Sequence, residues 1–281
     1  MCCFRDGSNH VSDDGIIRVI ASNEGSQWTS LSTISHPEAD LRDPKLTVAP
    51  DGRLMLSICV TWNGETDGKP RTAWTFSSDG EEWSELRFLD DPDVWLWRLT
   101  WHKGTAYSMG YQTGNHSGIA PYTYDHNRGF SRKGGPVYNT YFPNEASVCF
   151  TDSNVLCLLR RNKGRQSTAI LGKSTSFAGN WSWQELKRTI EGPHLINAPK
   201  NNLIAGGRIL NAEQQEPRTA ILSLELNPAE LSELEQLPSG GDTGYPGVIL
   251  EDGTLHISYY SSHESEKPDI YLATRELSRY R

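Results

Sequence analysis

A turn followed by a β-rich run recurs about every fifty residues, and this repeat constrains the fold more than any other feature. The copies read DGRLMLSICV at 51, KGTAYSMGY at 103, DSNVLCLLR at 152, NNLIAGGR at 201 and DGTLHISYY at 252. Extrapolating one period back from 51 reaches Met1–Arg5, which predicts a sixth copy. A period of this length is typical of architectures built from repeated supersecondary units.

Further strand-like runs flank each copy. DPKLTVAP precedes the copy at 51, RTAWTFS follows it, and a Trp-containing run, WSELRF, comes next. Four short antiparallel strands at this spacing are typical of a β-propeller blade. We therefore predict an all-β protein, a six-bladed β-propeller formed by a single domain over residues 1–281. Helix is expected only at 227–236, where NPAELSELEQ would form one or two turns in a loop.

The two ends of the chain fall inside blades in this scheme. The chain starts in the second strand of the first blade, which is predicted to lack its N-terminal strand, and it stops after the third strand of the sixth. The two outstanding strands with their turns amount to roughly 20–30 residues at ordinary strand lengths. The natural N-terminus, and any signal peptide on it, would then lie outside this sequence.

The composition argues against several kinds of binding partner. Aspartate and glutamate number 35 against 27 lysines and arginines, a net charge of −8, and no basic run suggests nucleic acid. No run of eighteen apolar residues suggests a membrane span. The odd cysteine count favours reduced, buried thiols and a reducing, cytoplasmic setting; the five are Cys2, Cys3, Cys59, Cys149 and Cys157. No metal-ligand spacing or phosphate loop predicts a cofactor, and nothing indicates an oligomeric state.

Three Trp-containing turns share a pattern of serine, glycine and tryptophan: SNEGSQW (22–28), SSDGEEW (77–83) and the looser STSFAGNW (174–181). An acidic side chain can bond the backbone amides of such a turn, glycine permits its geometry, and tryptophan fills the blade interface. These turns resemble the Asp-box turns of the sialidase superfamily, although the first two are one residue shorter than the usual form of that turn. We expect them to be structural.

Polar residues recur at equivalent ends of otherwise apolar strands. In a propeller, innermost strands start at the face where second strands end, so these residues would surround one central pocket. The innermost starts supply Arg42-Asp43, Trp97-Arg98, Asn144-Glu145, His194, Asn197, Asp242 and Tyr245; the second-strand ends supply Arg5-Asp6, Thr61-Trp62, Tyr111, Arg160-Arg161, Arg208, Tyr259-Tyr260 and His263. Buried charge is costly unless paired or used, so this placement predicts a site.

Over nearly its whole length the chain resembles the sialidase superfamily. Glu145 in YFPNEASVCF, Arg160 in CLLRR, Arg208 in IAGGR and Tyr245 in TGYPGV are similar in order and rough spacing to the family's site residues. The resemblance implies that Tyr245 is a nucleophile, that Glu145 accepts its proton, and that Arg160 and Arg208 grip a sugar carboxylate.

The chain also departs from the family. The opening Arg-Ile-Pro phrase that carries the first arginine of the triad is absent, so Arg5 would be an active-site arginine of the following loop. The acid stays open between Asp6, Asp13 and Asp43, with His10 as a further candidate. Position at an innermost-strand start favours Asp43, and similarity favours Asp6.

Structural readings compete with these roles. Tyr245 could be a buried tyrosine bonded to backbone, Glu145 an ion-pair partner of Arg160, and Arg208 a strut. Arg98, between Trp95, Trp97 and Trp101, could stack on indole rings. His194, proposed to bind substrate, could equally be a packing residue.

The leading hypothesis is an exo-glycoside hydrolase that acts on a glycan with an anionic, sialic-acid-like terminal sugar. Its pocket should be electropositive, because Arg5, Arg98, Arg160 and Arg208 would outnumber Asp43 and Glu145. The alternatives are a non-catalytic glycan-binding propeller and a uronate polysaccharide lyase, in which Tyr245 or a histidine abstracts the C5 proton.

Overall fold

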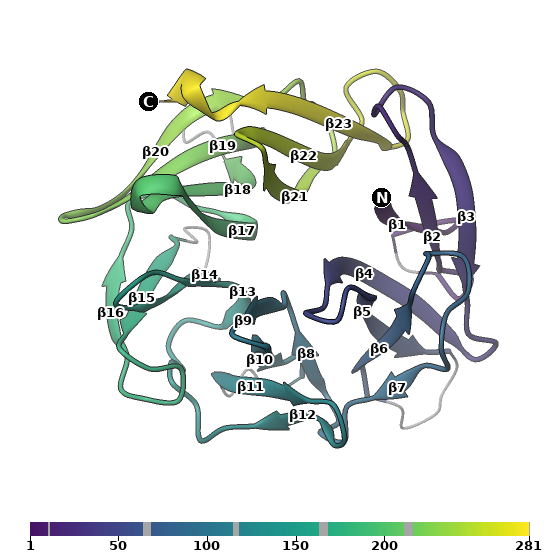
Figure 1. The fold of residues 1–281 in the computed structure, drawn as a ribbon, viewed down its shortest axis with the longest axis horizontal. Helices are drawn as coiled ribbons and strands as arrows, with labels where there is room; N and C mark the ends of the chain where they lie inside the picture. Colours follow the sequence, from purple (N-terminus) through teal and green to yellow (C-terminus); the bar gives the residue numbers. More distant parts are fainter. Residues whose placement is uncertain (11, 64–68, 115–117, 163–167, 211–215, 281) are drawn as a thin grey trace. The chain divides into compact units, whose positions relative to one another are not determined.

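Strands make up almost all regular structure of the chain. The computed structural model describes residues 1–281 except 11, 64–68, 115–117, 163–167, 211–215 and 281. In this part the helices are two short 3-10 turns, η1 (Pro199–Asn201) and η2 (Leu277–Tyr280), and neither could span a membrane (Figure 1). The all-β prediction is confirmed.

The chain divides into two compact units. The first contains Met1–Asn115 and Tyr122–Lys133, and the second contains His116–Pro121 and Gly134–Arg281. Because each unit has its own sheets and its own candidate residues, we describe each by itself.

The first unit begins with a three-stranded antiparallel sheet of β1 (Cys2–Asp6), β2 (Ile16–Ala21) and β3 (Thr29–Ile34). Two further antiparallel groups follow, joined by one parallel pair between Arg71 of β6 and Val94 of β8. Their strands are β4 (Ala39–Val48), β5 (Leu54–Trp62), β6 (Arg71–Ser77), β7 (Arg87–Phe88), β8 (Val94–Leu96), β9 (Thr100–His102), β10 (Thr105–Gln112), β11 (Ile119–Asp125) and β12 (Gly129–Arg132). The first three residues of β11 are grouped with the second unit.

The second unit has three antiparallel sheets, each in chain order. The first two have four strands and the third has three. The strands are β13 (Pro143–Phe150), β14 (Val155–Arg161), β15 (Ile170–Ser174) and β16 (Ser182–Glu185); β17 (Glu191–Ala198), β18 (Asn202–Leu210), β19 (Pro217–Leu226) and β20 (Ala229–Gln236); β21 (Thr243–Glu251), β22 (Thr254–Ser261) and β23 (Asp269–Glu276).

The repeat read from the sequence corresponds to real strands. Its six copies are β1, β5, β10, β14, β18 and β22, and each pairs in antiparallel register with its neighbours. The helical turns predicted at 227–236 are wrong, because β20 pairs with β19 from Ala229 to Gln236. Alanine, leucine and glutamate favour helix locally, but the pairing and the burial of Leu231 override that preference.

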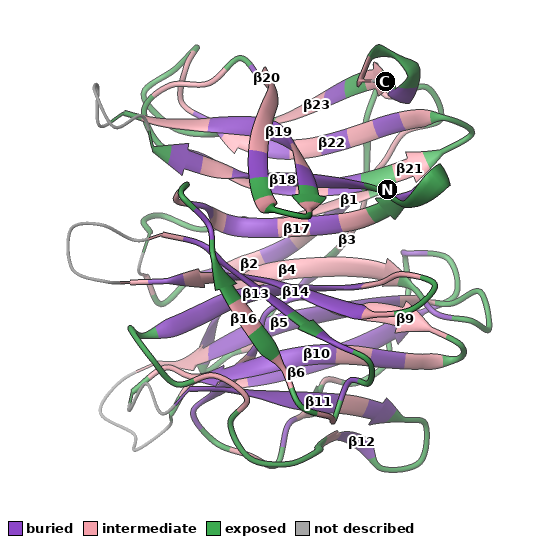
Figure 2. Ribbon diagram, turned by 90° about the vertical axis from the view of Figure 1, so that its left-hand side faces the viewer, coloured by how far each residue is buried: buried purple, intermediate pink, exposed green. Residues whose placement is uncertain are grey.

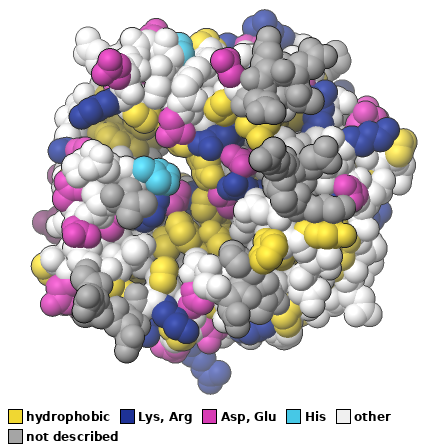
Figure 3. Space-filling view, turned by 180° about the vertical axis from the view of Figure 1, so that it is seen from behind, with side chains coloured by type: hydrophobic (Ala, Val, Ile, Leu, Met, Phe, Trp, Pro, Cys, Tyr) yellow, Lys and Arg dark blue, Asp and Glu magenta, His cyan; other side chains and the backbone are white. Residues whose placement is uncertain are grey.

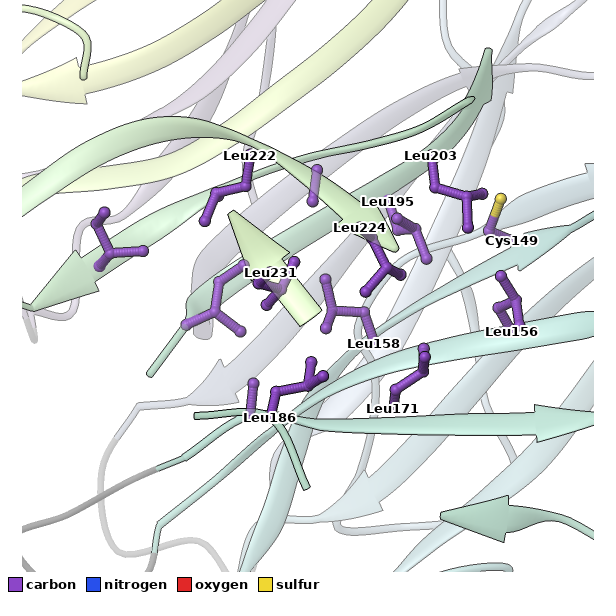
Figure 4. Close-up of a cluster of buried hydrophobic side chains, with 14 of the residues drawn as sticks. Cys149, Leu156, Leu158, Leu171, Leu186, Leu195, Leu203, Leu222, Leu224 and Leu231 are labelled. Carbon is purple, nitrogen blue, oxygen red and sulfur yellow. The ribbon is translucent and has the colours of Figure 1, made fainter. Parts of the chain in front are cut away.

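The core of the second unit lies between its sheets. Leu158 and Leu171 of the first sheet pack with Leu195, Leu203 and Leu222 of the second (Figure 4). Buried residues follow the strands, whereas exposed residues concentrate in the connections (Figure 2). Burial of apolar surface contributes about 25 cal/mol per Å², so these alternating leucines hold the sheets that carry the candidate site.

The predicted turn chemistry is present at 77–83. The Asp79 carboxylate accepts hydrogen bonds from the amides of Glu81 (2.8 Å) and Glu82 (3.1 Å), and Gly80 has a φ of 87°. The Trp83 indole donates to Ser32 on β3 at 2.9 Å. This turn therefore fastens one sheet of the first unit to the next.

No disulfide joins the five cysteines, all of which lie in the described part of the chain. Cys59, Cys149 and Cys157 are buried, whereas Cys2 and Cys3 are partly exposed. The predicted burial thus holds for three of the five.

Candidate functional site

A β-bulge near the start of β21 presents Tyr245. Gly244 pairs with Tyr260 and Gly247 with Ser258, so Tyr245 and Pro246 together face Tyr259. The φ of Tyr245 is 54°, a left-handed conformation that is uncommon for a residue with a side chain. Bulges re-aim side chains at functional sites, and this one explains the position of a tyrosine between tight-turning residues.

Neighbouring glycines provide the space for this ring. A Cβ on Gly192 would lie 2.7 Å from Cδ1 of Tyr245, and a Cβ on Gly244 would lie 2.8 Å from Nε of Arg208. Both glycines also have positive φ values, 58° and 136°. The strand starts therefore need glycine at these two positions for both backbone and packing reasons.

Tyr245 and Glu145 form a direct pair. The tyrosine hydroxyl donates to Oε1 of Glu145 at 2.8 Å. Nη1 of Arg160 donates to the same carboxylate oxygen at 2.7 Å and to the hydroxyl oxygen at 3.1 Å. The second oxygen, Oε2, accepts from the amide of Gly192 at 2.6 Å. The contact that the sequence analysis expected between these two residues is present.

Two further carboxylates hold the arginines. Nη2 of Arg160 donates to Oε1 of Glu191 at 2.7 Å, and Nη1 of Arg208 donates to Oε2 of the same residue at 3.2 Å. Nη2 of Arg208 donates to Oδ1 of Asp242 at 3.0 Å and also contacts the Tyr260 hydroxyl. These bonds connect β14, β17, β18 and β22 with Asp242, the residue before β21.

The Tyr245 ring is held on two sides. The Arg208 guanidinium lies 4.9 Å from its centroid, and the Tyr260 ring stacks on it at 6.1 Å with planes 18° apart. The hydroxyl is therefore held at one place relative to Glu145.

Burial changes the pKa values of Glu145 and Tyr245. It raises the pKa of Glu145, although Arg160 and the Gly192 amide act in the opposite direction. Burial, followed by the negative charge of Glu145, raises the pKa of Tyr245 well above its ordinary value. The shared proton consequently rests on the phenol, while an ionised Glu145 can accept it.

The expected excess of positive charge is absent from the site in the second unit. Arg160 and Arg208 face three carboxylates, Glu145, Glu191 and Asp242, so its formal charge is −1 when all are ionised. The sequence analysis missed Glu191, although EGP at 191–193 matches the bulge position of TGYP at 243–246. It noted His194 instead, whose Nδ1 accepts from the Val248 amide at 2.8 Å and holds β17 against β21.

In the first unit, Arg5 and Arg42 lie at the buried carboxylate of Asp40, and His10 lies beside Arg42. Arg5 donates from Nε to Oδ1 of Asp40 at 2.9 Å and from Nη2 to Ser12 at 2.8 Å. Nη2 of Arg42 lies 3.4 Å from Nε2 of His10, and its Nε lies 3.9 Å from Oδ2 of Asp40. Asp40 was not among the predicted residues.

Asp43 occupies the bulge of β4 between Arg42 and Lys45, with a φ of 48°. It thus has the register position and backbone conformation of Tyr245, and proline follows it as well. Its carbonyl accepts from the Lys45 ammonium at 2.8 Å.

The remaining candidates of the first unit lie elsewhere. Asp6 pairs with Arg18 at 2.5 Å, and both side chains are partly exposed. Arg98 is buried, and the carbonyl of Asp13 accepts from the Asn63 amide group at 2.9 Å. Asp6 therefore bonds to Arg18, whereas Arg5 bonds to Asp40 and Ser12. The sequence had predicted Asp6 and Arg5 at the same site.

Charges on the surface are mixed. On the face drawn in Figure 3, lysine and arginine side chains lie among acidic ones, and the described residues there form no continuous basic patch. No three histidine, cysteine or acidic side chains in the described ranges are arranged to hold a metal ion.

Solved structures with a similar fold include several carbohydrate-active enzymes. A protein of unknown function from Dyadobacter fermentans DSM 18053 is 19% identical with a TM-score of 0.76, over 97% of this chain and 89% of that one. The α-L-arabinanase of Penicillium chrysogenum is 15% identical with a TM-score of 0.63, over 95% and 86%. The endo-arabinase of Bacteroides thetaiotaomicron VPI-5482 is 14% identical with a TM-score of 0.60, over 84% and 94%.

These likenesses show the fold, which is the propeller-like fold of these glycoside hydrolases. A comparison with curated proteins gave no match. The sequence model of BNR repeat-like domains matches residues 1–257, which is most of the chain. The protein therefore belongs to the BNR repeat-like domain family.

Proposed function

We propose that the protein is an exo-glycoside hydrolase in which Tyr245 is the nucleophile and Glu145 its base. The observation that carries this proposal is the 2.8 Å hydrogen bond from the tyrosine hydroxyl to the carboxylate, with Arg160 contacting both groups. The carboxylate that accepts this bond is buried and is also bound by the Gly192 amide, so the phenol lies against a fixed group that can accept its proton.

The chemistry follows from these contacts. The phenol oxygen attacks the anomeric carbon, its proton passes to Glu145, and the bond to the leaving-group oxygen breaks while an acid protonates that oxygen. Water then attacks the same carbon and gives a proton to the deprotonated acid, the bond from the carbon to the tyrosine oxygen breaks, and the phenol recovers its proton from Glu145. The Arg160 guanidinium, 3.1 Å from the hydroxyl, stabilises the negative charge that develops there.

The acid in this proposal comes from the first unit. Asp43 is the first choice because it shares the bulge position and positive φ of Tyr245. Asp6 is the second. The proposal includes closure of the six antiparallel strand groups into one six-bladed propeller, with Arg5, Arg98 and His10 contributing to substrate binding.

The resemblance to sialidases implies a sialic-acid-like terminal sugar, whereas several structural neighbours are named as enzymes of arabinose- or xylose-containing substrates. The assay therefore begins with aryl glycosides of both kinds. A glycan-binding protein without activity is the second candidate, and one observation favours it: Arg208 is held by four protein groups, as a strut would be.

Tyr245→Phe tests the proposal. We expect turnover of the aryl glycoside to fall by several orders of magnitude, because the nucleophilic oxygen is removed while the ring keeps its packing. The loss of the hydroxyl's hydrogen bond should lower the free energy of unfolding by only about 0.5–1.5 kcal/mol.

Tyr259→Phe is the matched control. Its hydroxyl donates to the Pro238 carbonyl at 2.9 Å in the same unit. The loss of stability should therefore be similar to that of Tyr245→Phe, and turnover should equal that of wild type. Mass spectrometry of wild type with a 2-fluoro aryl glycoside should find the sugar on Tyr245. Equal activity of both variants would refute the proposal.

A further inference from the structure

Three of the N–H groups of Arg160 already donate within the protein. An arginine has five N–H groups. Nη1 donates to Glu145 and to the Tyr245 hydroxyl, and Nη2 donates to Glu191. Nε has no partner in the described part of the chain, but it is buried and beyond the reach of a ligand. One N–H on Nη2 is left, directly beside Glu191.

Arg208 is engaged in the same way. Nε donates to the Thr243 carbonyl, Nη2 to Asp242 and the Tyr260 hydroxyl, and Nη1 to Glu191. One N–H on Nη1 is left, again beside Glu191. The two donors that a ligand could use therefore belong to different guanidinium groups, with one glutamate between them.

A sugar carboxylate fits this arrangement poorly. Arginine binds carboxylates best through two parallel N–H bonds from one fork, and neither guanidinium has two accessible donors left, because the unpartnered Nε of Arg160 is buried. The carboxylate would also lie against Glu191, in a cluster where three acidic groups already outnumber two arginines. Like charges in contact weaken binding strongly.

A sugar hydroxyl fits it well. A hydroxyl can accept from one of the remaining N–H groups and donate to a carboxylate oxygen at the same time. Glu191 offers its oxygens between the arginines, and Asp242, with about half of its side chain exposed, offers another acceptor.

We propose that Glu191 makes this site selective for uncharged sugars and excludes acidic ones. The inference rests on the proposed function for the location of the site, and it departs from the anionic sugar that the resemblance to sialidases implies. Glu191 is in this view a specificity-determining residue that acts through Arg160 and Arg208.

The test measures binding, so that it does not depend on turnover. The probes are the methyl glycosides of L-arabinose, D-xylose and D-galactose on the neutral side, and those of N-acetylneuraminic acid and D-glucuronic acid on the acidic side. Wild type should bind at least one neutral probe more tightly than both acidic ones. Glu191→Gln, which keeps the shape and removes the charge, should bind an acidic probe at least about tenfold more tightly than wild type.

The matched control is Glu251→Gln. Glu251 is exposed at the opposite end of β21 from Tyr245, so this variant changes the net charge equally without touching the arginines. If Glu191→Gln unfolds, Asp242→Asn provides the same loss of charge at a more exposed position and should also favour the acidic probes.

The outcomes separate the two proposals. Tighter binding of an acidic probe than of every neutral one by wild type would overturn the inference, as would no binding in either class or an equal gain in Glu251→Gln. Neutral binding without hydrolysis would refute the proposed function and leave this inference intact. Hydrolysis of a sialoside by wild type would support the proposed function and overturn this inference.

Discussion

At the scale of single residues, Tyr245 and Glu145 behave as one titrating pair. Burial raises the pKa of both, and the negative Glu145 raises that of Tyr245 further. The phenol therefore stays neutral at rest, and in the proposed mechanism its reactivity depends on whether Glu145 is ionised when substrate is bound.

This dependence predicts the acid limb of the pH profile. The ordinary pKa of a glutamate is about 4.3, and that of Glu145 is raised, so the base is lost as pH falls through a value above 4.3. We expect kcat/KM to decline on the acid side at this higher pH. Arg160 lowers the pKa of Glu145, so Arg160→Gln should move the limb to still higher pH.

A control for the pH profile lies on the same sheet. Glu185 is an exposed partner of Arg161, and Glu185→Gln should leave the limb where it is. An acid limb at or below the ordinary glutamate value in wild type would show that Glu145 is not the base.

At the scale of elements, bulges in β13, β17 and β21 build the site of the second unit, and β4 of the first unit carries a similar bulge. They lie at Asn144-Glu145, Gly192-Pro193 and Tyr245-Pro246 and, in β4, at Asp43-Pro44. In three of them the first residue has a positive φ and proline follows. One backbone geometry thus presents an aspartate, a glycine and a tyrosine, and the residue type decides what each position can do.

Gly192→Ala tests this packing. The variant brings a Cβ to 2.7 Å from the Tyr245 ring and also places alanine at a positive φ. The backbone cost alone is about 1–2 kcal/mol, and the displaced ring should add to it and reduce turnover.

Gly253→Ala separates the two effects. Gly253 has a φ of 82°, and nothing lies within 4 Å of the position that a Cβ would take there, so its variant carries the backbone cost alone. We expect a larger fall in the free energy of unfolding for Gly192→Ala, and lost turnover only there. Equal urea midpoints and equal turnover would show that Gly192 does not position Tyr245.

At the scale of the whole molecule, the buried thiols report whether both units form one domain. Cys59 lies in the first unit, and Cys149 and Cys157 lie in the second. Burial raises the pKa of Cys149 to about 12 and raises those of the other two as well, so none should react in the folded protein at neutral pH.

We expect all three to become reactive at the same urea concentration, because one solved structure of similar fold covers 97% of the chain and a single domain unfolds cooperatively. Mass spectrometry after pulse labelling with an alkylating reagent measures each thiol separately. A lower midpoint for Cys59 than for Cys149 and Cys157, or the reverse, would show two independently folding domains.

The sequence by itself determined most of the strands, their period, and most of the residues at the site. These features are local: turn residues and alternating apolar positions mark a strand whatever it packs against. Charged or phenolic groups at the ends of apolar strands are costly to bury, so they indicate a site. This is how the sequence pointed to Tyr245, Glu145, Arg160 and Arg208.

Only the tertiary structure decided how those residues are paired. Tyr245 and Glu145 are 100 residues apart in the chain, and Arg160 donates to Glu191, which lies 31 residues further along. The bulges set which side chains face one another, and Glu191 joins the arginines only through that register. The charge around Arg160 and Arg208 is a sum over these long-range neighbours, and the sequence did not indicate that Glu191 is one of them.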